Sequence, residues 1–153
     1  ESPMSWPANV RYFSPDGDPQ LGDPSGEFMN PILMMTLDRA RHDLGAPFVV
    51  TSGWRSVEHN RAVGGASDSA HLGGNAVDGY FDGVSLFRQF VHLARYAFEG
   101  IGIYPYTNPP TMHVDVKVRT PGIVTWWVRT ASALYVYAPT SEFLAELREL
   151  ATR

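Results

Sequence analysis

The chain has 153 residues, an apolar fraction of 44% and no cysteine. The length predicts one compact domain, and the missing thiol excludes a disulfide framework, a cysteine-ligated metal site and a cysteine nucleophile. The net charge is −4 without any basic run, which argues against nucleic acid as a partner, and no apolar run approaches the roughly 18 residues of a membrane span.

The first 27 residues predict an irregular arm. Prolines and glycines alternate through this stretch, and proline resists the interior of a helix because it lacks an amide donor. The residues concerned are Pro3, Pro7, Pro15, Gly17, Pro19, Gly22, Pro24 and Gly26. We therefore expect residues 1–27 to form an arm on the surface, followed by a domain of residues 28–153.

A helix is predicted over residues 30–44. Asn30 suits the N-cap, Pro31 suits the first helical position and Gly45 suits the position after the end. Apolar residues recur three or four positions apart within the segment, so they lie on one helical face. Residues 47–51 then predict a short buried strand.

The remaining elements come in mixed order. Helices are predicted near residues 56–62, after Ser85 with an apolar face that extends to Phe98, and from Thr140 onward. Strands are predicted at residues 76–81, 101–104, 112–116, 123–128 and 134–137. This order indicates an α+β fold in which helices flank a small antiparallel sheet.

The segment Ser69–Asp78 carries the pattern that is most informative about chemistry. His71 and Asp78 lie seven residues apart across a Gly-Gly turn, which lets the chain fold back and bring them together. His113 lies on another apolar strand. Two histidines and one carboxylate leave the fourth position of a zinc ion for water, as in catalytic sites. On spacing alone, surface hydrogen bonding by a loop is the commoner reading of such a pair.

The string Ser-x-His-x-x-Gly-x-Ala-x-Asp at residues 69–78 resembles the motif of the M15 family of zinc peptidases, the D-Ala-D-Ala carboxypeptidase group. Matching segments follow the family order at residues 50–56, 59–66, 100–105 and 112–115. The resemblance covers roughly residues 28–130. It implies the hedgehog/DD-peptidase fold, one catalytic zinc and the hydrolysis of peptides in bacterial cell walls.

The resemblance also implies roles for individual residues. His71, Asp78 and His113 match the zinc ligands. Arg55 matches the family arginine that holds a substrate carboxylate or the polarised carbonyl oxygen, and a guanidinium fork suits either task. The side chains expected to contact the substrate are Arg55, Ser69, Tyr104 and Trp127.

The general base is where this sequence departs from the family pattern. Some members carry a glutamate three residues before the last histidine ligand, and others a histidine two residues before it; Pro110 and Thr111 stand there. Asp115 shares a strand face with His113, because residues two apart point the same way. Asp115 is interpreted as the base or proton shuttle, with orientation of a ligand as the alternative. Asp68 is a weaker candidate.

The sequence thus predicts a metallopeptidase that hydrolyses peptide bonds in peptidoglycan stem peptides, as a DD-carboxypeptidase or an endopeptidase of endolysin type. Pro110 keeps an alternative open: a non-catalytic zinc-binding member of the fold that serves as a structural or binding protein, for example in a phage particle. A third reading is a domain without metal whose motif is fortuitous. The resemblance implies an extracytoplasmic location, in the periplasm or cell wall, or association with a phage.

Overall fold

The computed structural model describes residues 5–153, which form four α-helices, two short 3-10 helices and a six-stranded sheet. The first four residues of the expected arm lie outside the described residues. In chain order the elements are η1 (Pro19–Leu21), α1 (Pro31–Leu44), β1 (Phe48–Ser52), α2 (Val57–Ala62), η2 (Ala70–Gly73), β2 (Ala76–Phe81), α3 (Leu86–Leu93), β3 (Gly100–Tyr104), β4 (Thr111–Asp115), β5 (Thr125–Arg129), β6 (Tyr135–Tyr137) and α4 (Ser141–Leu150).

The α+β class is confirmed, and one strand pair departs from a purely antiparallel sheet. The strand order is β1-β2-β4-β3-β5-β6, and only β3 and β5 run parallel. β4 pairs with β2 on one edge and with β3 on the other, so β5 joins at the remaining edge of β3. After β4, residues 116–124 lead the chain back to the end of the sheet where β3 begins, so β5 runs parallel to β3.

Helix α1 begins and ends as the sequence predicts. The Asn30 side chain accepts hydrogen bonds from the amides of Ile32 and Leu33, and Gly45 ends the helix with a φ of 73°. Helix α3 is shorter than the apolar run that follows Ser85, because it ends at Leu93. The amide of Glu99 already donates to the carbonyl of Asp115, so the chain must leave the helix to begin β3.

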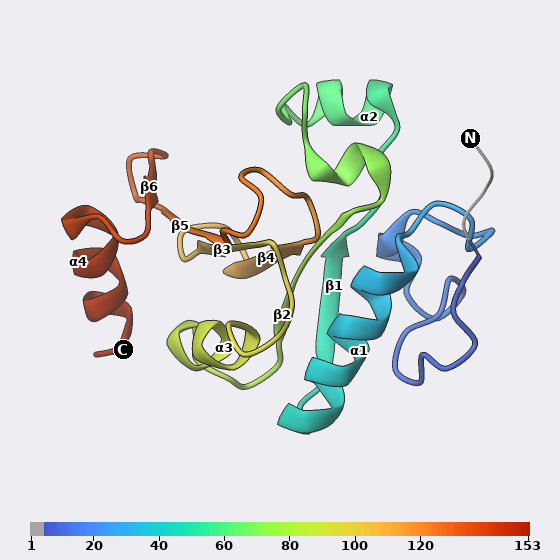
Figure 1. The fold of residues 1–153 in the computed structure, drawn as a ribbon, viewed down its shortest axis with the longest axis horizontal. Coiled ribbons are helices and arrows are strands. Elements are labelled where there is room, and N and C mark those ends of the chain that lie inside the picture. The colour runs from blue at the N-terminus through green and yellow to red at the C-terminus, as the bar shows by residue number, and fades with distance from the viewer. Residues whose placement is uncertain (1–4) are drawn as a thin grey trace.

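The two faces of the sheet differ in chemistry, and β4 shows this most clearly. Met112 and Val114 lie in the hydrophobic core, whereas His113 and Asp115 point to the opposite face, since side chains alternate along a strand. Helix α3 packs against β2, β3 and β4, and α4 packs against β5 and β6 (Figure 1). Helices α1, α3 and α4 therefore contribute to the apolar core, and the other face carries the polar residues of β4.

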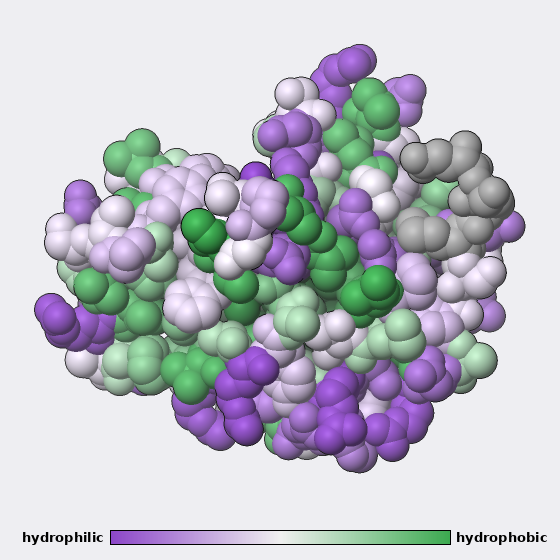
Figure 2. All heavy atoms as spheres, in the orientation of Figure 1, coloured by the Kyte–Doolittle hydropathy of each residue, from purple (hydrophilic) through white to green (hydrophobic). Residues whose placement is uncertain are grey.

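The outer surface mixes polar and apolar residues over the face seen in Figure 2. Helix α2 and the loop after it project beyond the rest of the outline, at the top of Figures 1 and 2. None of the helices within residues 5–153 combines the length and the hydropathy that crossing a bilayer requires.

Residues 5–29 are irregular apart from η1, yet they are tied firmly to the fold. Leu21 and Met29 are fully buried. The buried carboxylate of Asp23 accepts hydrogen bonds from three amides, including that of Met29 at 2.9 Å. The amide of Trp54 donates to the carbonyl of Leu21 at 2.8 Å. This segment therefore supports the chain that follows β1, while a boundary at residue 28 stays a prediction.

Gly74 joins η2 to β2 at a point where only glycine fits. Its φ is 70°, and an added Cβ would overlap the carbonyl oxygen of Phe28. The amide of Asn30 donates to the Gly74 carbonyl at 2.9 Å, so this contact also fixes the start of α1. The Gly-Gly turn of the motif is thus held by the segment before α1.

Replacing Gly74 by alanine is expected to lower the free energy of unfolding by at least about 2 kcal/mol, because strain from the positive φ and backbone overlap add together. Gly83 is the matched control: its φ is 75° and nothing lies within 4 Å of an added Cβ. Gly83→Ala is expected to cost only about 1 kcal/mol. Urea unfolding of both variants measures the difference, and equal losses would contradict the close contact at Gly74.

Candidate metal centre

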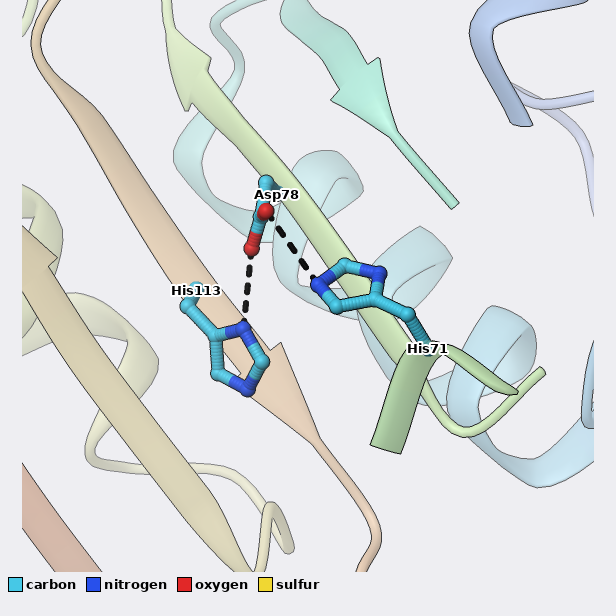
Figure 3. Close-up of side chains that lie close together, drawn as sticks. All are labelled: His71, Asp78 and His113. Carbon is cyan, nitrogen blue, oxygen red and sulfur yellow. Dashed lines mark hydrogen bonds and ion pairs between the residues drawn. The ribbon is translucent and has the colours of Figure 1, made fainter. Parts of the chain in front are cut away.

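Three side chains from η2, β2 and β4 converge on the polar face of the sheet: His71, Asp78 and His113 (Figure 3). Asp78 and His113 are direct partners in the β2–β4 register. His71 Nε2 lies 3.2 Å from Asp78 Oδ2, and His113 Nδ1 lies 2.8 Å from Asp78 Oδ1. One potential ligand atom from each residue lies within 4.8 Å of the other two.

The hydrogen bonds of His71 determine which nitrogen faces Asp78 with a lone pair. Nδ1 lies 2.7 Å from the carbonyl oxygen of Gly53, which can only accept, so Nδ1 carries the proton. In the neutral ring Nε2 then presents a lone pair to the Asp78 carboxylate. Nε2 is buried and has no hydrogen-bond partner within residues 5–153. The lone pair of His71 Nε2 and the negative charge of Asp78 repel each other, and a cation bound between them would remove this repulsion.

His113 is arranged in the same way from the other side. Its Nε2 lies 2.6 Å from Asp115 Oδ2, so the carboxylate holds the proton on Nε2 and leaves Nδ1 to face Asp78. Two imidazole nitrogens and a carboxylate form a donor set that zinc accepts. Neighbouring ligands of a tetrahedral zinc lie about 3.3 Å apart, close to the separation between His71 and Asp78. The three residues therefore fit a divalent metal ion.

The electrostatics of the three residues point to the same conclusion. Burial opposes the charged form of His113, but hydrogen bonds to Asp115 and Asp78 outweigh it and raise its pKa from 6.5 to about 9. Burial also opposes ionisation of Asp78, yet the hydrogen bond from His113 and the proximity of both imidazole rings hold the pKa of this carboxyl well below its ordinary value. Without a metal, a proton on His113 supplies the positive charge that the carboxylate requires.

The structure favours the second of the two roles expected for Asp115. Asp115 is fully buried, lies beyond the far nitrogen of His113 and accepts two hydrogen bonds from Arg119, at 3.0 and 2.7 Å. Burial raises the pKa of Asp115, but the hydrogen bonds from His113 and Arg119 lower it to about 2. A carboxylate so strongly paired is a poor proton acceptor, and it is well placed to orient His113.

Arg55 lies beside the three residues. Its Nη2 is 3.7 Å from Asp78 Oδ2, and its Nη1 donates to Asn60 Oδ1 at 3.2 Å. The Arg55 amide donates to the carbonyl of His71 at 3.0 Å, which ties the two segments together. The guanidinium is thus held next to the candidate metal position, in the wall of the pocket where a ligand would bind.

The three residues open into a pocket of about 620 Å³ whose lining includes Arg55, Ser69, Tyr104 and Trp127. Trp127 Nε1 donates to the Tyr104 hydroxyl at 3.1 Å, so the two rings form one wall. Burial raises the pKa of Tyr104, which keeps its hydroxyl neutral. Trp126 points the other way and packs edge-on against Phe90 in the core. The Ser69 hydroxyl accepts a hydrogen bond from the His71 amide and caps η2.

Sequence reasoning missed Arg119 and two glycines that give the site its space. An added Cβ on Gly100 would lie 2.6 Å from Asp115 and Arg119, and one on Gly102 would lie 2.6 Å from the Trp127 ring. Both glycines of β3 face the site, Gly100 at the start of the strand and Gly102 at its middle, which lets the large side chains of β4 and β5 meet above them. The alternation of glycine with isoleucine in residues 100–103 was the available signal.

Comparison with known proteins gives one family. The family model described as Peptidase M15 matches residues 20–115, well over half of the chain. The match starts before α1 and ends at Asp115, so it contains Arg55 and the three candidate ligands but not Arg119 or β5. No curated protein in the comparison matches the chain.

The affinity for zinc is expected to rise with pH. The raised pKa of His113 stabilises the metal-free fold fully below its ordinary value of 6.5, and this stabilisation is lost as the pH rises through about 9. Zinc needs the neutral ring, so the apparent affinity should increase on the order of a hundredfold between about pH 6 and about pH 8.5. Titration calorimetry measures this change. An affinity independent of pH would contradict the competition between the metal and the proton.

Asp115→Asn is expected to weaken zinc binding about 10- to 100-fold, because His113 loses the carboxylate that fixes its ring. The fold should persist, since asparagine has the same shape. A competition assay with a chromogenic chelator measures the affinity. Asp43→Asn, which removes an exposed carboxylate on α1, is the control. Equal zinc affinity in the Asp115 variant and the native protein would contradict the orienting role.

Proposed function

Since this chain belongs to the peptidase M15 family, we propose that it is a zinc-dependent peptidase that cleaves peptide bonds in the stem peptides of bacterial peptidoglycan. One observation carries the metal part of this proposal: His71 Nε2 is buried without a hydrogen-bond partner in residues 5–153 and lies 3.2 Å from a carboxylate oxygen. Such an arrangement is stable when a cation completes it.

His71, Asp78 and His113 would hold the zinc ion, and the pocket side leaves room for a water ligand and a substrate carbonyl. When bound, zinc would lower the pKa of that water toward about 7 and polarise the carbonyl. Gly53 and Asp115 keep the two imidazole rings in the tautomers that this requires. Arg119 in turn holds Asp115.

Arg55 supplies the positive charge next to the reacting carbonyl. Its distance of 3.7 Å from Asp78 places the guanidinium at the edge of the metal position, where negative charge develops on the carbonyl oxygen during hydrolysis. The same group can instead hold a terminal carboxylate of the substrate. The first role belongs to an endopeptidase and the second to a carboxypeptidase.

The proton acceptor is assigned to Asp68 in this proposal. The carboxylates that line the pocket within residues 5–153 are Asp68 and Asp78, and Asp78 is a proposed ligand. Asp68 is exposed and held by Lys117, whose ammonium group lies 3.3 Å from Oδ2. The hydrogen bond from Lys117 lowers the pKa of Asp68 and keeps it ionised, and because this side chain is exposed, unlike that of Asp115, a proton that it accepts passes on to solvent.

The pocket also supports a peptide substrate. It combines the aromatic wall of Tyr104 and Trp127 with cationic side chains, which suits a short peptide rich in carboxylates. Stem peptides of peptidoglycan have this character. Because they lie outside the cytoplasm, the proposal includes a site of action in the periplasm or cell wall, or delivery with a phage.

A second candidate function is favoured by one observation. Position 110 holds proline, and Asp115 is neutralised by Arg119, so neither supplies the base that other members of the family are expected to have. The chain would then bind zinc and peptide without cleaving, as a structural or binding protein. Both candidates share the metal centre and differ only in turnover.

Digestion of purified peptidoglycan separates the two candidates. The zinc-loaded protein is expected to release new amino groups, to lose this activity with a chelator and to regain it with zinc. His113→Ala should reduce release to the uncatalysed background, and mass spectrometry of the fragments would name the bond. His42→Ala, which removes a histidine of α1 outside the pocket, is the matched control. Full zinc occupancy without any release would leave the binding function and contradict the peptidase.

A further inference from the structure

We infer that Arg129 forms an anion subsite at the far end of the pocket and binds a carboxylate of the peptide about three residues from the bond that is cleaved. This inference rests on the proposed function, because it names the part of the substrate that the same pocket selects. Arg129 lies outside the segment that matches the family model, so family membership assigns it no role.

The alternation of β5 places Arg129 on the face of the sheet that holds the site. Trp127 and Arg129 both line the pocket, whereas Trp126 and Val128 pack on the core side. In the β5–β6 register Arg129 is paired with Tyr135, which also lines the pocket. The guanidinium therefore lies in the pocket wall beyond Trp127.

Arg129 differs from the other cations of the pocket. Arg119 is paired with Asp115, Lys117 with Asp68, and Arg55 with Asp78 and Asn60. Arg129 makes no ion pair within residues 5–153, and its Nε is buried without a hydrogen-bond partner there. Burying part of an unpaired guanidinium is costly, and a carboxylate on a bound peptide would remove this cost through two parallel hydrogen bonds.

The sheet sets the distance between Arg129 and the metal centre. Gly102 on β3 is the register partner of both His113 and Trp127, so β4 and β5 lie two strand spacings apart. Arg129 lies two residues further along β5. With strands about 4.8 Å apart and about 3.3 Å per residue, the Cα atoms of His113 and Arg129 are about 12 Å apart, which equals three to four residues of extended peptide.

An aromatic surface connects the two ends of this path. The centroid of the Trp127 ring lies 5.2 Å from that of His113 and 6.3 Å from that of Tyr137. The ring centroids of Tyr104 and Tyr135 lie 6.4 Å apart. Trp127 itself is buried, so the exposed rings of Tyr135 and Tyr137 give a peptide most of its apolar contact, and this contact does not fix its register. A charge at the end of the wall would fix it, because only one position of the peptide places a carboxylate against Arg129.

The test uses the zinc-loaded protein and the synthetic peptide L-Ala-γ-D-Glu-L-Lys-D-Ala-D-Ala. Two amidated forms accompany it, one with the α-carboxyl of D-Glu amidated and one with the C-terminus amidated. The native protein is expected to cleave the free acid about tenfold faster, in kcat/KM, than one of the amides, and Arg129→Gln should abolish this preference. The amide concerned identifies which carboxylate is bound. Arg129→Lys keeps the charge without the fork and should retain part of the preference.

Arg148→Gln is the control, because it removes an exposed arginine on α4 with the same change in net charge. It should leave the preference unchanged. If the native protein cleaves none of the peptides, the peptidase proposal fails. Calorimetry of the same peptides then tests the subsite alone. In that case the Kd of the free acid must be about tenfold lower than the Kd of one of the amides. An equal preference in the native protein and in Arg129→Gln, or no binding at all, would overturn the inference.

Discussion

The structure depends on one carboxylate that faces two imidazole nitrogens. Asp78 lies between His71 Nε2 and His113 Nδ1, and the other nitrogen of each ring already holds its proton toward Gly53 or Asp115. Two lone pairs and a carboxylate at such distances require a positive charge among them. A proton on His113 supplies it in the metal-free chain, and a zinc ion would supply it in the functional one.

The rest of the fold keeps these atoms in place. The β2–β4 register puts Asp78 directly opposite His113, and the buried segment around Leu21 packs against Gly53, whose carbonyl orients His71. An added Cβ on Gly53 would lie 2.5 Å from the carbonyl oxygen of Leu21, so this support depends on close contact. The helices stabilise the opposite face through the apolar core. Hence the residues before α1, although irregular, help to orient the side chains of the candidate metal centre.

Patterns of neighbouring residues in the sequence predicted the helix caps, the strand alternation and the turns of this structure. The cap at Asn30, the alternation in β4 and the Gly-Gly turn of the motif each depend on neighbouring residues, and the resemblance to the M15 family added which three side chains meet. The sequence did not predict the parallel placement of β5 or the pairing of Asp115 with Arg119. Both depend on how residues 116–124 cross the sheet, and no periodicity records that path. The position of Asp115 on the strand therefore suggests a base, and only the ion pair with Arg119 shows otherwise.

We propose that His71, Asp78 and His113 hold a zinc ion through the nitrogens and the carboxylate that face one another. A crystal structure of the zinc-loaded protein, with anomalous scattering recorded on both sides of the zinc absorption edge, tests it most directly. One peak is expected, bonded to Nε2 of His71, Nδ1 of His113 and the Asp78 carboxylate at about 2.0–2.2 Å. No peak among these residues, or coordination by Nε2 of His113 with Asp115 displaced, would contradict it.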